Sequence, residues 1–120
     1  MITSKHFKEL EFKRCIPTCS LQDMNQHFMN KLDTLRDVAG MPIIINSAYR
    51  SEGWEKSKNR NGKGDHSQGR GVDIRCHTST DRYRILQAAI QVGFTRIGIA
   101  KTFIHVGEGE NLPREVIWMY

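Results

Sequence analysis

The chain has 120 residues, of which 38% are hydrophobic. This length and composition suit one soluble-type globular domain with its own core, so we expect residues 1–120 to form a single domain. The formal net charge of +5 favours anionic partners, of which nucleic acid is one candidate. No apolar run approaches the roughly 20 residues that a membrane-spanning helix needs, which excludes a membrane-spanning protein.

The first ten residues contain neither an apolar stretch nor a small-residue cleavage site, so no signal peptide is visible. We therefore expect synthesis in the cytoplasm, and a target outside it would require another route of release. The three cysteines are an odd number without the spacing of a metal site. A Cys15–Cys19 disulfide stays open, although reduced thiols fit the missing signal peptide better. Cys76 is interpreted as a small buried hydrophobe.

Taken in chain order, residues 1–19 are mixed and polar, and Ser20 with Asp23 then forms the pattern of a capping box. A helix is predicted from there to Gly40, because apolar residues recur every three or four positions. The β-branched run in residues 41–46 predicts a buried strand. The apolar residues that we expect to anchor the N-terminal segment are Phe7, Leu10, Phe12 and Ile16.

The polar segment 51–63 contains Trp54 and leaves room for a short helix. Its basic run at 56–63 is interpreted as a solvated loop, with a substrate-facing loop as the alternative. Beyond it, alternating or β-branched runs predict strands, and one amphipathic stretch predicts a second helix. The expected fold class is α+β, with two main helices packed on a small, largely antiparallel sheet. The expected elements are a strand at 72–76, a helix at 81–92 capped by Thr78, Ser79 or Thr80, a hairpin of strands 96–100 and 103–106, and a strand at 116–120.

Three side chains with the chemistry of zinc ligands stand out. His66 precedes Asp73 by seven residues across a glycine-rich turn, and His105 lies in a short apolar strand. Two imidazoles and one carboxylate form a suitable zinc site with a fourth position left for water. Each residue also has an ordinary interpretation, as a solvated loop histidine, a turn or cap aspartate and a hydrogen-bonded core histidine.

Four ordered segments resemble the D-Ala-D-Ala carboxypeptidase-like zinc peptidases, the family that includes vancomycin-resistance dipeptidases and small phage endolysins. The resemblance covers the chain from about residue 21 to residue 118, and it implies the fold shared by these peptidases and the Hedgehog signalling domain. The segments are Ser-Ala-Tyr-Arg-Ser at 47–51, His-Ser-Gln-Gly-Arg-Gly-Val-Asp at 66–73, Gly-Phe through Gly-Ile at 93–99, and Phe-Ile-His-Val at 103–106.

The resemblance implies a zinc cofactor held by His66, Asp73 and His105. It also implies that Arg50 contacts the substrate or polarises its carbonyl. Further expected substrate-binding residues are Ser47, Tyr49 and Trp118, the last either lining the cleft or plugging the core. The implied substrate is the peptide stem of bacterial peptidoglycan, cut by D-Ala-D-Ala carboxypeptidase or stem endopeptidase activity. A phage or prophage lysin acting as a monomer would fit these features.

The chain also departs from the family pattern. Gly64 stands where a serine is usual, and Gly107 stands where an aspartate is frequent. Thr102 stands where many members carry an Asp or Glu that acts as the general base. The carboxylates left for proton transfer are Glu108, downstream of the last ligand, and Asp65, next to the first. The sequence alone does not distinguish between these two carboxylates. We predict Glu108 and Arg50 as the catalytic residues.

Two other classes of function deserve comparison. A non-hydrolytic zinc-binding module for cell-wall recognition would explain the threonine in place of an acid, since the Hedgehog domain resembles the family in its metal site while serving in binding. A small nucleic-acid-binding protein is suggested only by the net charge, and it would show salt-dependent DNA binding that survives chelation. That alternative leaves the histidines and the motif order unexplained, so we expect no nucleic-acid partner.

Overall fold

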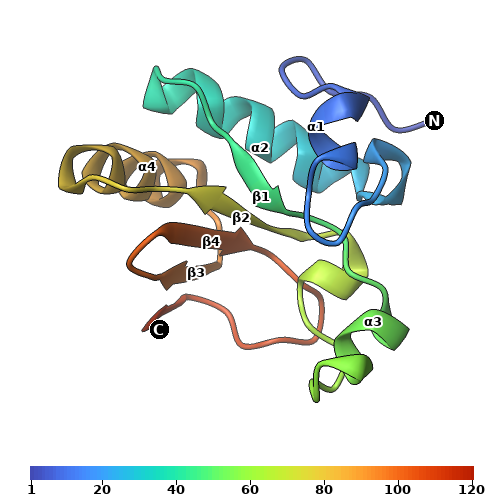
Figure 1. The fold of residues 1–120 in the computed structure, drawn as a ribbon. Helices are drawn as coiled ribbons and strands as arrows, with labels where there is room; N and C mark the ends of the chain where they lie inside the picture. Colours follow the sequence, from blue (N-terminus) through green and yellow to red (C-terminus); the bar gives the residue numbers. More distant parts are fainter.

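The computed structural model describes residues 1–120 and is organised around one β-sheet (Figure 1). The sheet has five strands. The strands lie in the spatial order β1-β2-β4-β3-β5, and every neighbouring pair is antiparallel except β3 and β5, which are parallel. The prediction of an α+β fold with a largely antiparallel sheet is therefore confirmed. The bounds are β1 (Ile45–Ser47), β2 (Gly71–Arg75), β3 (Arg96–Ile99), β4 (Phe103–Gly107) and β5 (Val116–Met119).

Two long helices, α2 (Gln26–Ala39) and α4 (Ser79–Val92), cover one face of the sheet (Figure 1). Alternate strand residues point toward them and are fully buried, whereas the residues between point to the opposite face. Burying each large apolar side chain contributes roughly 1.5–3 kcal/mol, so this layer supplies most of the stabilisation. Its fully buried members include Phe28, Met29, Leu32 and Leu35 of α2, Ile85 of α4, and Val72, Ile74, Ile104 and Val106 of the strands.

The helix predicted to start at Ser20 is in fact two elements, and that prediction was wrong at its N-terminal end. Ser20 caps only a 3-10 turn, η1 (Leu21–Asp23), and the chain then becomes extended before Asn25 caps α2. The Asn25 side chain accepts a hydrogen bond from Phe28 N at 2.9 Å. The backbone N–H of Asn25 donates to Gly69 O at 2.9 Å. The break in the helix therefore serves a contact with a distant loop, which local sequence patterns do not report.

The N-terminal segment forms one short helix, α1 (Glu9–Lys13). Phe7 and Phe12 are buried as predicted. Leu10 and Ile16 are 57% and 77% exposed, so the prediction that they anchor the segment was wrong. A helix of little more than one turn can bury only one narrow stripe, and Phe12 occupies it. All three cysteines are buried free thiols.

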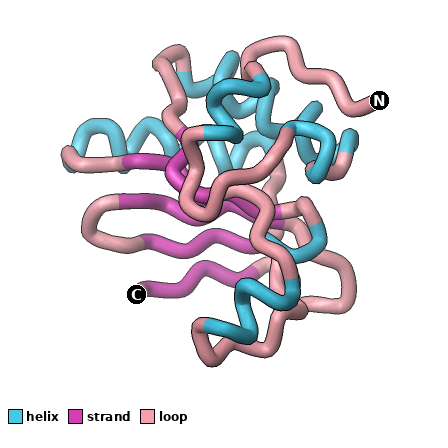
Figure 2. The backbone as a smooth tube through the Cα atoms, turned by 45° about the vertical axis from the view of Figure 1, so that its right-hand side comes forward, coloured by secondary structure: helices cyan, strands magenta, loops and turns pink.

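The remaining elements follow the predicted order along the chain. In the tube view the strands lie side by side, and most of the helical turns gather above them (Figure 2). The polar segment contains α3 (Glu52–Ser57), and a 3-10 turn, η2 (His66–Gln68), precedes β2. Thr78 caps α4 by accepting a hydrogen bond from Asp81 N. Strand β1 is shorter than the expected 41–46 strand and shifted toward its end. None of the helices is long and apolar enough to cross a membrane.

Candidate metal centre

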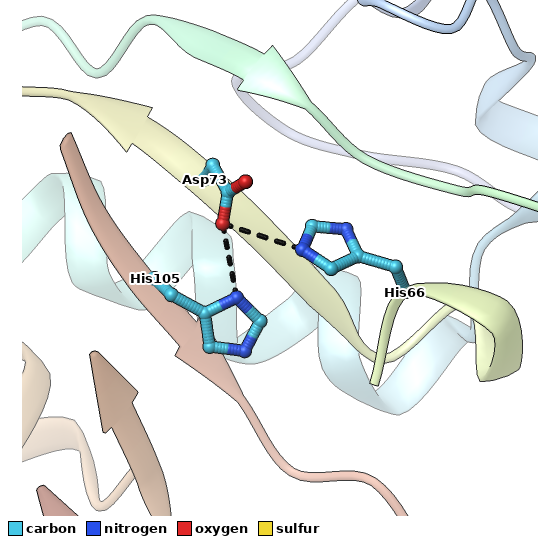
Figure 3. Close-up of side chains that lie close together, drawn as sticks. All are labelled: His66, Asp73 and His105. Atoms are coloured by element: carbon cyan, nitrogen blue, oxygen red, sulfur yellow. Dashed lines mark hydrogen bonds and ion pairs between the residues drawn. The ribbon is translucent and has the colours of Figure 1, made fainter. Parts of the chain in front are cut away.

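Three predicted ligands come together on the face of the sheet that the long helices leave uncovered. Antiparallel pairing of β2 with β4 places Asp73 directly opposite His105, and the η2 turn brings His66 beside them (Figure 3). Asp73 Oδ1 lies 3.3 Å from His66 Nε2 and 3.0 Å from His105 Nδ1. One donor atom from each residue lies within 4.8 Å of the other two. The spacing in sequence therefore becomes a compact set of three donors.

The glycine-rich turn holds His66 in place through Gly69. This residue ends η2 with a positive φ of 68°, a conformation that L side chains rarely adopt. A Cβ built there would lie 2.5 Å from Asp23 O and 3.1 Å from Met24 Cα. Only glycine lets the turn rest directly on the backbone that precedes α2. The position of the first ligand therefore depends on both the loop and the break in the helix.

Both imidazole rings are held by their second nitrogen. His66 Nδ1 is 2.6 Å from Ala48 O, and His105 Nε2 is 2.7 Å from Asp65 Oδ2. A carbonyl or carboxylate oxygen can only accept, so these two nitrogens carry the protons of the neutral rings. The lone pairs of His66 Nε2 and His105 Nδ1 then face the Asp73 carboxylate. Three acceptors that converge without a donor between them form a cation site, and two imidazoles with one carboxylate suit zinc.

The electrostatics of the cluster agree with this assignment. Burial raises the pKa of the Asp73 carboxyl, but its close contacts with the His105 and His66 rings outweigh burial and leave the pKa well below its usual range. Burial lowers the pKa of His105, whereas its contacts with Asp65 and Asp73 raise it by more, so the net shift is upward. The site therefore favours positive charge between the rings, which is the charge that a divalent cation supplies.

Arg50 lies beside the three donors and is held rigidly. Its Nε donates to Glu55 Oε1 at 2.8 Å, its Nη1 donates to Ser47 Oγ at 3.2 Å, and Nη1 is 3.6 Å from Asp73 Oδ2. Glu55 is itself buried and also pairs with Arg60. The predicted residues Arg50 and Ser47 therefore do border the cluster. The supporting roles of Glu55 and Arg60 were missed, because nothing in their sequence spacing distinguishes them from other surface charges.

Trp118 lines the uncovered face of the sheet and does not plug the core. Its ring centroid lies 5.5 Å from that of His105, and the Arg96 guanidinium lies 5.1 Å from the Trp118 ring. The indole packs across Gly98, where a Cβ would approach Trp118 Nε1 to 2.6 Å. Tyr49, by contrast, packs half-buried against the hydrophobic core. Of the two predicted aromatic residues, Trp118 packs beside the candidate ligand His105.

The structure does not bring Glu108 to the cluster. Its carboxylate binds Lys31 Nζ of α2 at 2.6 Å and lies 3.7 Å from His27 Nε2. Residues one or three positions apart in a strand point to opposite faces, so Glu108 follows Val106 toward the helices while His105 faces away from them. The choice of Glu108 as catalytic carboxylate thus lacks geometric support, because the sequence placed it near the last ligand but not on its face.

Asp65, the other carboxylate considered, lies behind His105. Besides the His105 contact, its oxygens accept from Arg96 Nε at 3.0 and 3.1 Å and from Gly109 N at 2.7 Å. Burial raises the pKa of Asp65, but the bonds from His105, Arg96 and Gly109 together lower it further, so the carboxyl stays ionised. Arg96 was not predicted as part of the site. Its location at the start of β3 gave no chemical signal in the sequence.

Comparison with known protein families agrees with this geometry. A family model described as peptidase M15 matches residues 5–107, which is most of the chain and includes all three candidate ligands. No curated protein shows a significant match. The match supports the resemblance noted from the four motifs and fits the fold of a small mixed sheet with helices on one side. The chain therefore belongs to the peptidase M15 family, whose members are zinc peptidases.

Proposed function

We propose that this metallopeptidase uses one zinc ion, held by His66, Asp73 and His105, to hydrolyse the peptide stem of bacterial peptidoglycan. The observation that carries the metal site is the convergence of three acceptor atoms whose partner nitrogens are already hydrogen bonded elsewhere. The substrate class rests on the resemblance and on the family match, which both point to peptides. The net charge of +5 is consistent with an anionic polymer as the setting of the reaction.

The residues around the metal site suggest how a peptide would be treated there. When bound, zinc supplies Lewis-acid polarisation of a carbonyl and a water with lowered pKa. Arg50, fixed by Glu55 and Ser47, would hold the terminal carboxylate of a stem peptide or stabilise the charge that develops on the scissile carbonyl oxygen. Trp118 would form an apolar wall against which a D-alanine methyl group can pack.

A second candidate function is favoured by one specific observation. Thr102 offers no acid, Asp65 is held by three donors behind His105, and Glu108 lies on the helix side of the sheet. A zinc-binding module that recognises cell wall without cutting it requires no free carboxylate beside the metal. Such a module would bind about one equivalent of zinc and purified peptidoglycan but would release no amines.

The direct test is the release of free amines from purified peptidoglycan, with and without a zinc chelator. Hydrolysis that disappears on chelation and returns with zinc is expected. Mass analysis of the products separates the two proposed activities, since a carboxypeptidase releases single D-alanine residues and an endopeptidase releases shortened stems. Stoichiometric zinc without amine release would select the binding module. A role as a phage or prophage lysin stays a prediction, which lysis of cells from outside and from within would test.

The matched variants for this test are two histidine substitutions. His66→Ala removes a candidate ligand and should lower both the zinc content and hydrolysis. His77→Ala changes an exposed histidine outside the cluster and should leave both unchanged. Equal zinc content in the two variants would overturn the ligand assignment.

A further inference from the structure

Three glycines enclose the Asp65 carboxyl group. Gly71 and Gly107 are register partners on β2 and β4, and Gly109 follows two residues later. A Cβ built on Gly107 would lie 2.5 Å from Asp65 Oδ2, and one on Gly71 would lie 2.5 Å from Asp65 Cβ. A Cβ on Gly109 would overlap Asp65 Oδ1. The space that side chains at these three positions would occupy is therefore filled by one carboxylate from another loop.

The same space adjoins the far nitrogen of a candidate ligand. The Cβ built on Gly107 would also lie 2.8 Å from His105 Nε2, the nitrogen that donates to Asp65 at 2.7 Å. A side chain attached at Gly107 would thus begin in the space that the Asp65 carboxylate fills beside His105 Nε2. The Asp65 carboxylate and a side chain at position 107 therefore compete for one space.

Asp65 is built to hold that position. Only 5% of the residue is exposed, and all of its partners are donors: His105 Nε2, Arg96 Nε and the backbone N–H of Gly109. A carboxylate fixed from three directions can orient the ring that it contacts. It is also too fully bonded to serve as a mobile proton carrier.

We propose that Asp65 is the positioning residue of His105: it keeps the ring proton on Nε2 and directs the Nδ1 lone pair toward the metal, and Gly107 is glycine because Asp65 needs its space. The inference rests on the metal site of the proposed function but not on the choice of substrate. Carboxylates that hold ligating histidines in this way typically change metal affinity by about 10–100-fold when removed.

The experiment measures the zinc dissociation constant of the full chain by competition with a chromophoric chelator. Asp65→Ala should weaken zinc binding by about 10–100-fold. Asp65→Asn keeps an oxygen that accepts from Nε2 and should lose less. Gly107→Asp alone would force two carboxylates into one space and should weaken binding and lower the melting temperature. The double variant Asp65→Ala/Gly107→Asp should bind zinc more tightly than either single variant.

Recovery in the double variant is the result that a merely structural role of Asp65 does not produce. Asp33→Asn is the matched control, because Asp33 is also buried and accepts three hydrogen bonds, from Ser4 Oγ, Lys5 N and His6 N, away from the cluster. It should lower the melting temperature without changing zinc affinity. The absorption spectrum of the cobalt-substituted protein should change in Asp65→Ala and return toward the original in the double variant.

The possible failures can be told apart. If the unaltered protein binds zinc and Asp65→Ala binds it within twofold as tightly, the positioning role is wrong while the metal site stands. If the double variant binds no better than the single variants, the shared-space argument is wrong. If the unaltered protein binds no zinc, the metal site and this inference fail together.

Discussion

The ion pair between Lys31 and Glu108 provides a test of whether Glu108 stabilises the helix side of the sheet or takes part in catalysis. The two side chains are 19% and 10% exposed, and their charged atoms are 2.6 Å apart. Lys31 Nζ also donates to Gly93 O at 3.0 Å, which links α2 to the end of α4. Glu108 Oε1 has no hydrogen-bond partner. Replacing Lys31 by methionine would also remove the partner of Glu108 Oε2, so neither carboxylate oxygen would accept a hydrogen bond from a side chain.

The expected cost follows from burial. Removing one partner of a fully buried pair costs roughly 3–5 kcal/mol, and the residual exposure here reduces that to about 2–3 kcal/mol. Unfolding entropy of about 2.1 cal/mol/K per residue gives roughly 0.25 kcal/mol/K for 120 residues, so 1 kcal/mol corresponds to about 4 °C. Lys31→Met should therefore lower the melting temperature by about 8–12 °C. Glu108→Leu combined with Lys31→Met should recover most of it, because no unpaired charge remains.

Thermal unfolding followed by circular dichroism in excess chelator measures these shifts without a contribution from metal. Zinc affinity and amine release, measured in parallel, should be kept in the stable double variant. A Lys31→Met protein that melts within 1 or 2 °C of the original would refute the burial argument, where those margins reflect about 0.5 kcal/mol. Loss of hydrolysis in the double variant, with zinc content and melting temperature preserved, would show instead that Glu108 takes part in the chemistry.

Four further results are expected. Asp73→Ala should lower bound zinc well below one equivalent and abolish hydrolysis, and undiminished zinc measured by metal analysis would contradict its role as a ligand. Zinc at about 100 times its dissociation constant should raise stability by about 2.7 kcal/mol, or roughly 10 °C in melting temperature, and an equal rise in Asp73→Ala would argue against a native-state site that includes Asp73. Arg50→Lys, which cannot reproduce the planar contacts to Glu55 and Ser47, should lower kcat/KM by about 100-fold at constant zinc content, whereas unchanged kinetics would remove Arg50 from the site. Because the pKa of His105 is raised, protons compete with metal at its ring; zinc affinity should weaken as the pH falls through and below that pKa, and calorimetry should show proton release on binding.

The main elements of the fold were accessible from the sequence because they depend on local periodicity. The hairpin of β3 and β4 and the helix α4 follow from alternation and from a stripe of apolar residues. The start of α2 could not be predicted in this way, because a hydrogen bond from Asn25 N to Gly69 O, forty-four positions away, fixes the extended residues before it. The exposure of Leu10 and Ile16 was equally hidden, since it depends on how a short helix meets the rest of the chain.

The candidate site shows the same division. The donor types and motif order identified His66, Asp73 and His105, and strand register explains why the last two meet. Which carboxylate stands near them could not be read from sequence distance, because Glu108 is three residues from His105 but on the other face. Asp65 is forty residues from His105 and touches it. The one trace of this contact in the sequence is Gly107, where a side chain would clash with the Asp65 carboxylate. A glycine alone does not identify the residue that fills its space.

The close packing of Gly69 against the backbone before α2 has a consequence for how this sequence can evolve. A larger residue at position 69 would push against Asp23 and Met24, and the η2 turn that carries His66 would have to rise with it. Substitutions in the backbone segment before α2 and in the η2 turn are thereby coupled. A change in one segment is tolerated only when the other segment shifts to accommodate it. Inherited variation between Asp23 and Asn25 should therefore track variation at position 69, even though none of these residues offers a donor to the metal.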